Sequence, residues 1–421
     1  MTQTIQLLPG ITLRCVRDTR FKQGALSIQF IRPMCREEAA MNALFPAVLL
    51  RGCRNYPDIR AVIGRLDDLY GASVGNVVRR VGDYQTAGFY CGFMEDRFAL
   101  AGDRILEPMV DLVRQLLLDP DLENGVFRGD FVEGEKKNLI ATLDSERNDK
   151  RAYSLNQLMR VMCREDSFGV PRLGDREAVA AIEPRTLYDH YRRVLRESRV
   201  DLFYVGSWEA ETVAAVLKPL FESIDRSYVN LPGQTGFHAV APEEKTEVME
   251  VTQAKLAMGF LTPITLRDEG FVAMQLLNLI FGAGMTSKLF MNIREKLSLC
   301  YDIGSSYSGA KGILSVSAGI DGDKVDLVRE QVLEQLRACQ QGQITAEELE
   351  AAKRAMYSNI RGIHDSPGSI EGYYATAALS GTGLSPEEHL RAVEGTTAEQ
   401  VAEAARTVTL HTTYILKGVR E

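Results

Sequence analysis

Residues 24–33 read GALSIQFIRP, and residues 254–263 read AKLAMGFLTP. Both stretches alternate apolar residues and then stop at a proline, which is the pattern of a strand followed by a turn. The two stretches are 230 residues apart, and Gly52 and Gly282 keep this offset where they close the runs ALFPAVLLRG and VAMQLLNLIFG. The chain therefore contains a weak internal duplication.

The duplication continues through most of the chain. Each half reads as strand, turn, helices, further strands, several helices and a closing strand. These blocks mix strands and helices without strict alternation, so the sequence predicts an α+β fold built from two similar domains. The further matching pairs are 63–69 with 293–299, 88–93 with 313–320, and 181–207 with 392–418.

Chain length also supports two domains. A chain of 421 residues is too long for one ordinary core and suggests domains of about 200 residues each. Between the repeats lies NLPGQTGFHAVAPEEKTE (230–247), and its Pro, Gly and charged residues are typical of a linker. We therefore expect an N-terminal domain at 1–229, a linker at 230–247 and a C-terminal domain at 248–421. The alternative is one large domain with a long loop at 230–247.

Charge and cysteine content exclude some function classes and suggest a compartment. The net charge of −8 argues against a nucleic-acid partner, which needs a basic face, and the chain has no polybasic segment for an acidic membrane surface. The seven cysteines form no CxxC pair, as is usual for a reducing compartment. With no visible signal peptide and no run of ~18 apolar residues, we expect a cytoplasmic protein.

The most informative motif is FGAGMTSKLFMNIREKLSLCYDIGSSY, residues 281–307. A turn at Gly282 and Gly284 precedes a predicted amphipathic helix, and Arg294 lies beside its apolar stripe. Tyr301 follows Arg294 by seven residues, where strand-like sequence begins. The stripe is expected to comprise Leu289, Phe290, Ile293 and Leu297 on one helical face.

This segment resembles the second-domain signature of the pitrilysin/insulinase-type (inverzincin) zinc peptidases, in which a glycine turn and SRLF…REK.GL.Y recur. The resemblance implies a clamshell of two similar α+β domains, each a mostly antiparallel sheet with helices packed on it. It also implies that Arg294 and Tyr301 bind substrate beside the Gly282–Gly284 turn, because a guanidinium and a phenol can hydrogen-bond a peptide carbonyl and its oxyanion. Lys288 and Ser298 depart from the family's arginine and glycine. The alternative is a surface arginine and a structural tyrosine.

The first half should then carry the family's HxxEH motif, in which two histidines bind zinc and a glutamate acts as base. Aligning ALFPAVLLRG (43–52) with that motif places Ala43 and Ala47 at the histidines and Pro46 at the glutamate. Proline is also expected to disturb the helix there. The third ligand position falls on Thr142 in EKKNLIATL (135–143), with Glu146 nearby. The zinc site is therefore degenerate, and we expect no catalytic residue and no bound metal.

No other catalytic arrangement replaces that motif. There is no GxSxG, and Cys300 has an apolar context that suggests packing. The histidines are not spaced three or four residues from one another, so each is expected to serve folding or lie on the surface. They are His190, His238, His364, His389 and His411.

The resemblance therefore indicates a non-catalytic, substrate-binding subunit that complements an HxxEH-bearing partner of the same family, with zinc on the partner and peptides as substrates. Alone, the chain is expected to have no peptidase activity. One alternative is a non-proteolytic scaffold or peptide-binding homologue, and another is an independent hydrolase with new residues. A homodimer remains possible.

Overall fold

The computed structural model describes residues 2–238 and 240–418. By its internal contacts the chain forms two compact units, and neither unit is a continuous stretch of sequence. The first unit comprises Met1–Asp144, Val170–Gln234 and His364–Leu379, and the second comprises Ser145–Gly169, Thr235–Ile363 and Ser380–Glu421. Each unit therefore includes a segment from the opposite half of the sequence.

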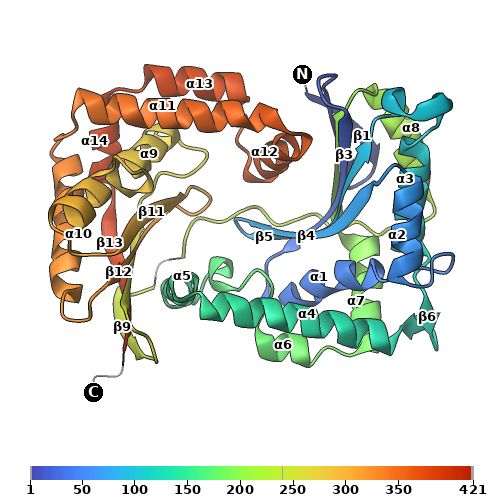
Figure 1. Ribbon diagram of the computed structural model, residues 1–421, viewed down its shortest axis with the longest axis horizontal. Helices are drawn as coiled ribbons and strands as arrows, with labels where there is room; N and C mark the ends of the chain where they lie inside the picture. The colour runs from blue at the N-terminus through green and yellow to red at the C-terminus, as the bar shows by residue number, and fades with distance from the viewer. Residues whose placement is uncertain (1, 239, 419–421) are drawn as a thin grey trace. The chain divides into compact units, whose positions relative to one another are not determined.

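The first unit is built on a six-stranded sheet of order β1-β2-β8-β3-β5-β4, in which β2 and β8 are parallel and the other neighbours are antiparallel (Figure 1). Its strands are β1 (Thr2–Leu8), β2 (Ile11–Arg17), β3 (Gln23–Pro33), β4 (Ser73–Val81), β5 (Tyr84–Met94) and β8 (Arg199–Gly206). A short hairpin joins β6 (Leu122–Glu123) and β7 (Val126–Phe127).

Helices cover one face of this sheet and form the main core of the first unit. Leu26, Ile28 and Phe30 alternate along β3 and point into that core, as the strand period of two predicts. The covering helices are α1 (Arg36–Leu49), α2 (Ile59–Asp68), α3 (Leu106–Leu118), α4 (Gly129–Asn148), α6 (Arg176–Ala180), α7 (Pro184–Glu197) and α8 (Ala210–Glu222). Ser27 and Gln29 lie on the opposite face, near α12 (Pro367–Ser380).

The second unit is built on a five-stranded sheet of order β11-β12-β10-β13-β9, in which only β13 and β9 are parallel. Its strands are β9 (Glu243–Val248), β10 (Ala254–Leu261), β11 (Asp302–Ser308), β12 (Ile313–Ile320) and β13 (Thr409–Lys417). One face packs on α9 (Phe271–Asn278), α10 (Val325–Gln340), α11 (Ala346–Gly362), α13 (Pro386–Gly395) and α14 (Ala398–Arg406), and α5 (Lys150–Met162) packs on the other.

The two sheets share one topology. The order β4-β5-β3-β8-β2 in the first unit matches β11-β12-β10-β13-β9 in the second, with the parallel pair at the same end. Strand β1 is an addition to the first sheet. The predicted α+β class, with two similar parts and mostly antiparallel sheets covered by helices, is confirmed.

Several helix starts follow directly from the sequence. Thr345, Ser385 and Thr397 each accept a hydrogen bond from the backbone N–H three residues later, and the residue there returns the bond. These capping boxes open α11, α13 and α14, because they satisfy backbone donors that a helix start leaves free.

One local expectation is corrected. Helix α1 runs continuously through Pro46, so the proline does not break it. Proline lacks the backbone N–H that would donate one hydrogen bond of the helix, but the helix continues to Leu49. Within the predicted linker 230–247, β9 begins at Glu243 and pairs with β13. Within residues 2–238 and 240–418, no helix has both the length and the apolar character needed to cross a membrane.

Candidate functional site

Arg294 and Tyr301 are held together by a direct contact in the second unit. Nε of Arg294 donates a hydrogen bond of 3.0 Å to the carbonyl oxygen of Tyr301. The Tyr301 N–H in turn donates to Gly319 O of β12 at 2.8 Å. Both side chains reach solvent, with Arg294 39% and Tyr301 55% exposed. The predicted pair is thus anchored through its backbone and presents its guanidinium and its ring outward.

The segment that carries Arg294 is a π-helix, η5 (Leu289–Lys296), preceded by a second π-helix, η4 (Leu279–Ala283). The predicted α-helical stripe is therefore wrong in part: Leu289 and Ile293 are fully buried, but Leu297 is 44% exposed. Phe290 is half-buried, and the Arg294 guanidinium stacks over its ring at 4.6 Å. The wider π turn changes which residues share a face. π-helices occur often at functional sites.

The turn between the arginine and the tyrosine has a left-handed residue. Ser298 has φ of +51°, a conformation in which glycine avoids the steric cost that a side chain adds. The resemblance places glycine at this position, so the structure explains that preference. Lys288, the other departure, is nearly buried, and its Nζ lies 2.8 Å from Glu348 Oε1. This lysine therefore serves an internal ion pair.

The hydroxyl of Tyr301 has a partner of its own. It donates a 2.9 Å hydrogen bond to Asp321 Oδ1, and Lys324 Nζ lies 2.8 Å from Asp321 Oδ2. The hydrogen bond to Asp321 raises the pKa of Tyr301, and it uses the one proton of the hydroxyl. The hydroxyl is thus oriented as a neutral donor.

The two glycines of the predicted turn differ in environment. Gly282 is buried, and a Cβ at this position would lie 2.6 Å from Ser305 Oγ and 2.7 Å from Leu289 Cδ1. Packing against β11 therefore requires the absence of a side chain at Gly282. Gly284 is half-exposed, and a Cβ at this position would make only ordinary contacts, 3.7 Å from Leu279 O and 4.0 Å from Thr286 N, so of the two glycines it is the one that a ligand can approach.

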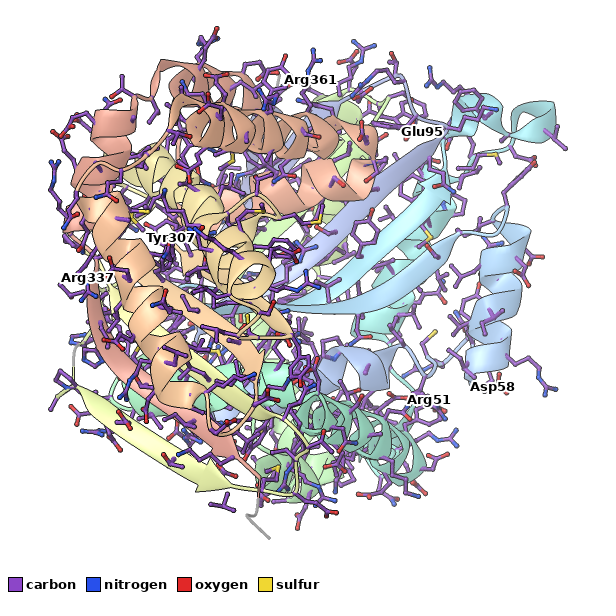
Figure 2. All side chains as sticks on the ribbon, turned by 60° about the vertical axis from the view of Figure 1, so that its left-hand side comes forward. Arg51, Asp58, Glu95, Tyr307, Arg337 and Arg361 are labelled. Carbon is purple, nitrogen blue, oxygen red and sulfur yellow. The ribbon has the colours of Figure 1, made fainter. Side chains whose placement is uncertain are left out.

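The degenerate zinc positions lie in the first unit. Ala43, Pro46 and Ala47 are on α1, where Ala43 is 3% exposed and Pro46 is also buried. Thr142 lies exposed on α4, where its hydroxyl donates to Asn138 O at 3.0 Å. Arg51, which follows α1 and is labelled in Figure 2, lies 3.4 Å from Glu135 of α4. No side chain at the four degenerate positions can ligate zinc.

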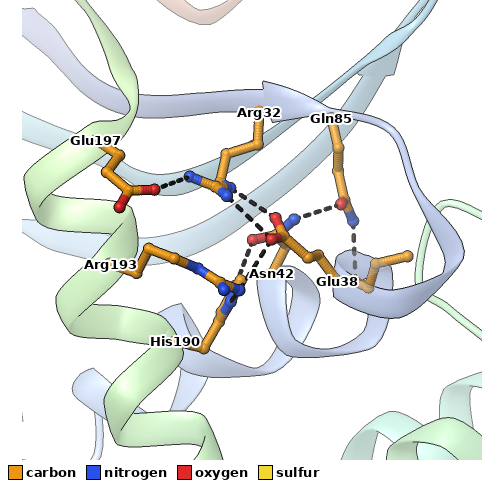
Figure 3. A network of polar contacts seen from close by, with 8 residues as sticks. Arg32, Glu38, Asn42, Gln85, His190, Arg193 and Glu197 are labelled. Atoms are coloured by element: carbon orange, nitrogen blue, oxygen red, sulfur yellow. Dashed lines mark hydrogen bonds and ion pairs between the residues drawn. The ribbon is translucent and has the colours of Figure 1, made fainter. Parts of the chain in front are cut away.

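A buried polar network on α1 is centred on Asn42, the residue directly before Ala43 (Figure 3). Asn42 Nδ2 donates to Gln85 Oε1 at 2.8 Å, and Asn42 Oδ1 is 2.7 Å from His190 Nε2. Since Asn42 Oδ1 can only accept, Nε2 of His190 carries the proton, and Nδ1 accepts from Arg193 Nη2 at 3.0 Å. Glu38 accepts from Arg193 and also binds Arg32.

His190 is therefore a structural histidine. Burial lowers its pKa to about 4, because the charged imidazolium loses its hydration. Both ring nitrogens are engaged, so neither can bind a metal. In the sequence, the only sign of this network is the polar residue Asn42 within the apolar run that follows Glu38.

The other potential reactive groups are also engaged in structure. His389 contacts Gln275, and His411 contacts Val240 O. Cys300 packs against the second core, and burial raises its pKa to about 11. In the part of the chain that the structure describes, no three His, Cys, Asp or Glu side chains gather in a way that could hold a metal ion.

One cavity of about 790 Å³ lies in the first unit, where α3, α7 and α8 end. Its rim includes Arg114, Arg192 and Arg196, together with Asp119 and Asp225. Helix C-termini carry partial negative charge, which basic side chains offset. The arginines are therefore explained by the three helix ends, and the cavity presents no catalytic group.

The chain resembles known proteins both in sequence and in structure. The family described as "Peptidase M16 inactive domain" matches residues 181–356. A probable inactive metalloprotease, YmfF of Bacillus subtilis (strain 168), is 28% identical over 409 residues, which are 97% of this chain and 96% of YmfF. The predicted resemblance to this peptidase family is thus confirmed by a match over residues 181–356 and by a relative that aligns along almost the whole chain.

Solved structures with a similar fold cover the whole chain. The crystal structure of a conserved protein from Enterococcus faecalis V583 has a TM-score of 0.93 and 27% identity, and the match covers 100% of this chain and 99% of that one. The M16 inactive domain of Pseudomonas fluorescens has a TM-score of 0.82 at 18% identity, covering 100% and 98%. The second likeness concerns the fold alone.

Proposed function

We propose that this M16-family chain is the non-catalytic, substrate-binding subunit of a two-chain zinc peptidase, in which an HxxEH-bearing partner supplies the metal. The single observation that carries the proposal is the contrast between the two predicted sites. The zinc positions are occupied by Ala43, Pro46, Ala47 and Thr142, whereas Arg294 and Tyr301 are present and anchored to each other at 3.0 Å. In a two-chain enzyme, that combination is what complementation requires.

The chemistry of the pair suits a peptide. Nε of Arg294 is used on Tyr301 O, and Nη1 is 3.4 Å from Glu295, which leaves guanidinium donors for a substrate carbonyl. The Tyr301 ring is exposed beside them. Fixed donors of this kind stabilise the oxyanion that develops when zinc-bound water attacks a peptide bond. In this proposal the partner performs the proton transfer, and this chain positions the peptide, with the cytoplasm as the compartment.

Recovery of the natural complex tests the proposal. The tagged chain is purified from its native host, and the co-purifying proteins are identified by mass spectrometry. A stoichiometric M16-family companion with an intact HxxEH, and peptide hydrolysis by the pair that a chelator abolishes, is the expected result. Recovery of the chain without such a companion would contradict the proposal and would favour the scaffold.

The scaffold alternative has its own supporting observation. The first unit contains a packed α1 and a fully paired network around Asn42 and His190, as expected of a region kept for stability alone. A scaffold would bind other proteins without any effect on peptide turnover. Activity of the companion that is the same with and without this chain would favour the scaffold.

A further inference from the structure

The face of the first sheet opposite its main core carries a cluster of polar side chains. On β3, Ser27 and Gln29 alternate with core residues and are 1% and 2% exposed. Arg79 projects from β4, two strands away in the order β3-β5-β4. Buried polar groups cost free energy unless they are hydrogen-bonded, so a stable fold requires hydrogen-bond partners for these side chains.

That partner is a single carboxylate. Glu371 Oε1 accepts hydrogen bonds from Ser27 Oγ at 2.7 Å, from Gln29 Nε2 at 2.6 Å and from Arg79 Nη1 at 3.0 Å. Its Oε2 accepts from Arg79 Nη2 at 2.7 Å. The Glu371 side chain is 0% exposed. Every donor belongs to the sheet, and together they form a bidentate, charge-assisted receptor for a carboxylate.

The receptor also contains a buried hydroxyl group that does not bind Glu371. Thr86 pairs with Arg79 across the β4–β5 register and is 1% exposed. Its Oγ1 has no hydrogen-bond partner among the residues that the structure describes. A buried hydroxyl without a partner is uncommon in a finished core. It indicates that the receptor can make one contact more than Glu371 uses.

Glu371 reaches the receptor from a distant part of the sequence. It lies on α12, 344 residues after Ser27, and the buried residues of that helix are Ile370, Glu371, Ala375, Leu379 and Ser380. Leu379 joins only a small cluster with Ile31, Val81 and Tyr84. Glu371 makes the charge-assisted attachment of α12 to the sheet, and Leu379 O also accepts a hydrogen bond of 2.7 Å from Gln234 Nε2.

We propose that Ser27, Gln29 and Arg79 form a binding site for the carboxylate of an acidic peptide segment, and that α12 is its tethered, releasable occupant. This site is separate from Arg294 and Tyr301, so it stands whether or not the chain belongs to a peptidase pair. Gly381 and Gly383 follow the helix. Glycine gives the backbone the conformational freedom that release of the helix requires. A tether keeps the occupant at a high effective concentration, so a free competitor binds only when the tethered helix is weakened.

The first experiment weakens the attachment of α12 and measures the protection of its backbone amides. Hydrogen exchange is measured on the full chain and on Glu371→Gln, which keeps the shape of the side chain but removes its charge. We expect amides of α12 to exchange at least tenfold faster in the variant, while amides of β3 and β5 keep their protection. If α12 stays as protected as in the wild type, the helix is not releasable and the proposal is overturned.

The second experiment measures whether a free peptide binds to the receptor. A labelled peptide with the sequence of residues 364–381 is added to the Glu371→Ala chain, and binding is followed by fluorescence anisotropy. We expect this peptide to bind at least tenfold more tightly than the same peptide with Glu371→Gln, and at least tenfold more tightly than it binds the wild-type chain. Equal binding of both peptides, or binding of neither, overturns the proposal. Adding Arg79→Met to the Glu371→Ala chain checks the receptor side and should abolish the preference.

Discussion

Nε of Arg294 donates to the carbonyl oxygen of Tyr301 at 3.0 Å, so the arginine fixes the backbone of the residue with which it is proposed to act. The chain between the two turns at Ser298, whose φ is +51°. The geometry of the pair therefore depends on a left-handed residue that is not glycine. The left-handed conformation of Ser298 therefore lowers the stability of the second unit.

Ser298→Gly should stabilise the second unit. A left-handed conformation costs an L-residue about 1–2 kcal/mol, and the extra freedom of glycine in the unfolded chain returns about 0.5–1 kcal/mol of that. We expect a net gain of about 0.5–1 kcal/mol, measured by thermal unfolding. As the control, Ser306→Gly in β11 should destabilise, because Ser306 lacks a positive φ. A loss of stability in Ser298→Gly would contradict this account.

His190→Gln should weaken the acid sensitivity of the first unit. The folded-state pKa of His190 lies near 4, below the ordinary 6.5, so unfolding takes up a proton between those values. The stabilising effect is complete above pH 6.5, falls as the pH drops and is gone below about 4; it amounts to about 3 kcal/mol. Glutamine keeps the donor to Asn42 and does not titrate.

The measurement is urea unfolding followed by the fluorescence of Trp208, the single tryptophan of the chain, which packs against the first core. The loss of unfolding free energy between pH 7 and pH 4.5 should shrink in His190→Gln. Replacement of the exposed His238 by glutamine should leave that loss unchanged. An unaltered pH profile in His190→Gln would show that this histidine does not control it.

Restoring histidines to α1 should not restore zinc binding. Ala43 is 3% exposed, so Ala43→His overfills a packed site and should cost about 1–3 kcal/mol. Ala43→His combined with Ala47→His supplies two imidazoles, but Thr142 is no ligand. We expect the Tm of the double variant to be the same with and without added zinc. As the control, Ala141→His on the exposed side of α4 should have little effect on stability. A rise in Tm with zinc would mean that the site has kept its architecture.

Lys311→Met should strongly destabilise the second unit. Lys311 Nζ lies 3.2 Å from Asp166 Oδ1, and both side chains are 0% exposed. Removing the cation leaves a buried carboxylate, which costs about 3–5 kcal/mol. The surface pair of Lys324 and Asp321 offers the matched control, since solvent screens this pair and Lys324→Met should have little effect on stability. Circular dichroism during denaturation compares the two variants, and equal losses would refute the role of the buried pair.

The repeat explains how much of the fold could be predicted from the sequence. Matching strand patterns in 24–33 and 254–263 became β3 and β10, which hold the same place in sheets of the same order. Strand patterning is a local property, so it could be seen directly. The crossing of α5 and α12 into the opposite units could not, because it depends on contacts between residues far apart in the sequence, such as Glu371 and Ser27.

The candidate site was predictable only where the motif is local. Arg294 and Tyr301 are seven residues apart, and their contact follows from that short segment. The π-helix over Leu289–Lys296 was not predictable, since its apolar residues also fit an α-helical period. The network of Asn42, Gln85 and His190 joins residues 43 and 148 positions apart, and sequence periodicity carries no information about such distant pairs.

Arg294 is proposed to act on a peptide bound at a partner's zinc site. The most direct test is peptide turnover by the HxxEH companion assembled with wild-type chain, with Arg294→Ala or with Arg337→Ala, an exposed arginine on α10 (Figure 2). The account predicts equal assembly of all three pairs and a loss of about 100-fold in kcat/KM for Arg294→Ala alone. Unchanged turnover by an intact Arg294→Ala pair would contradict it.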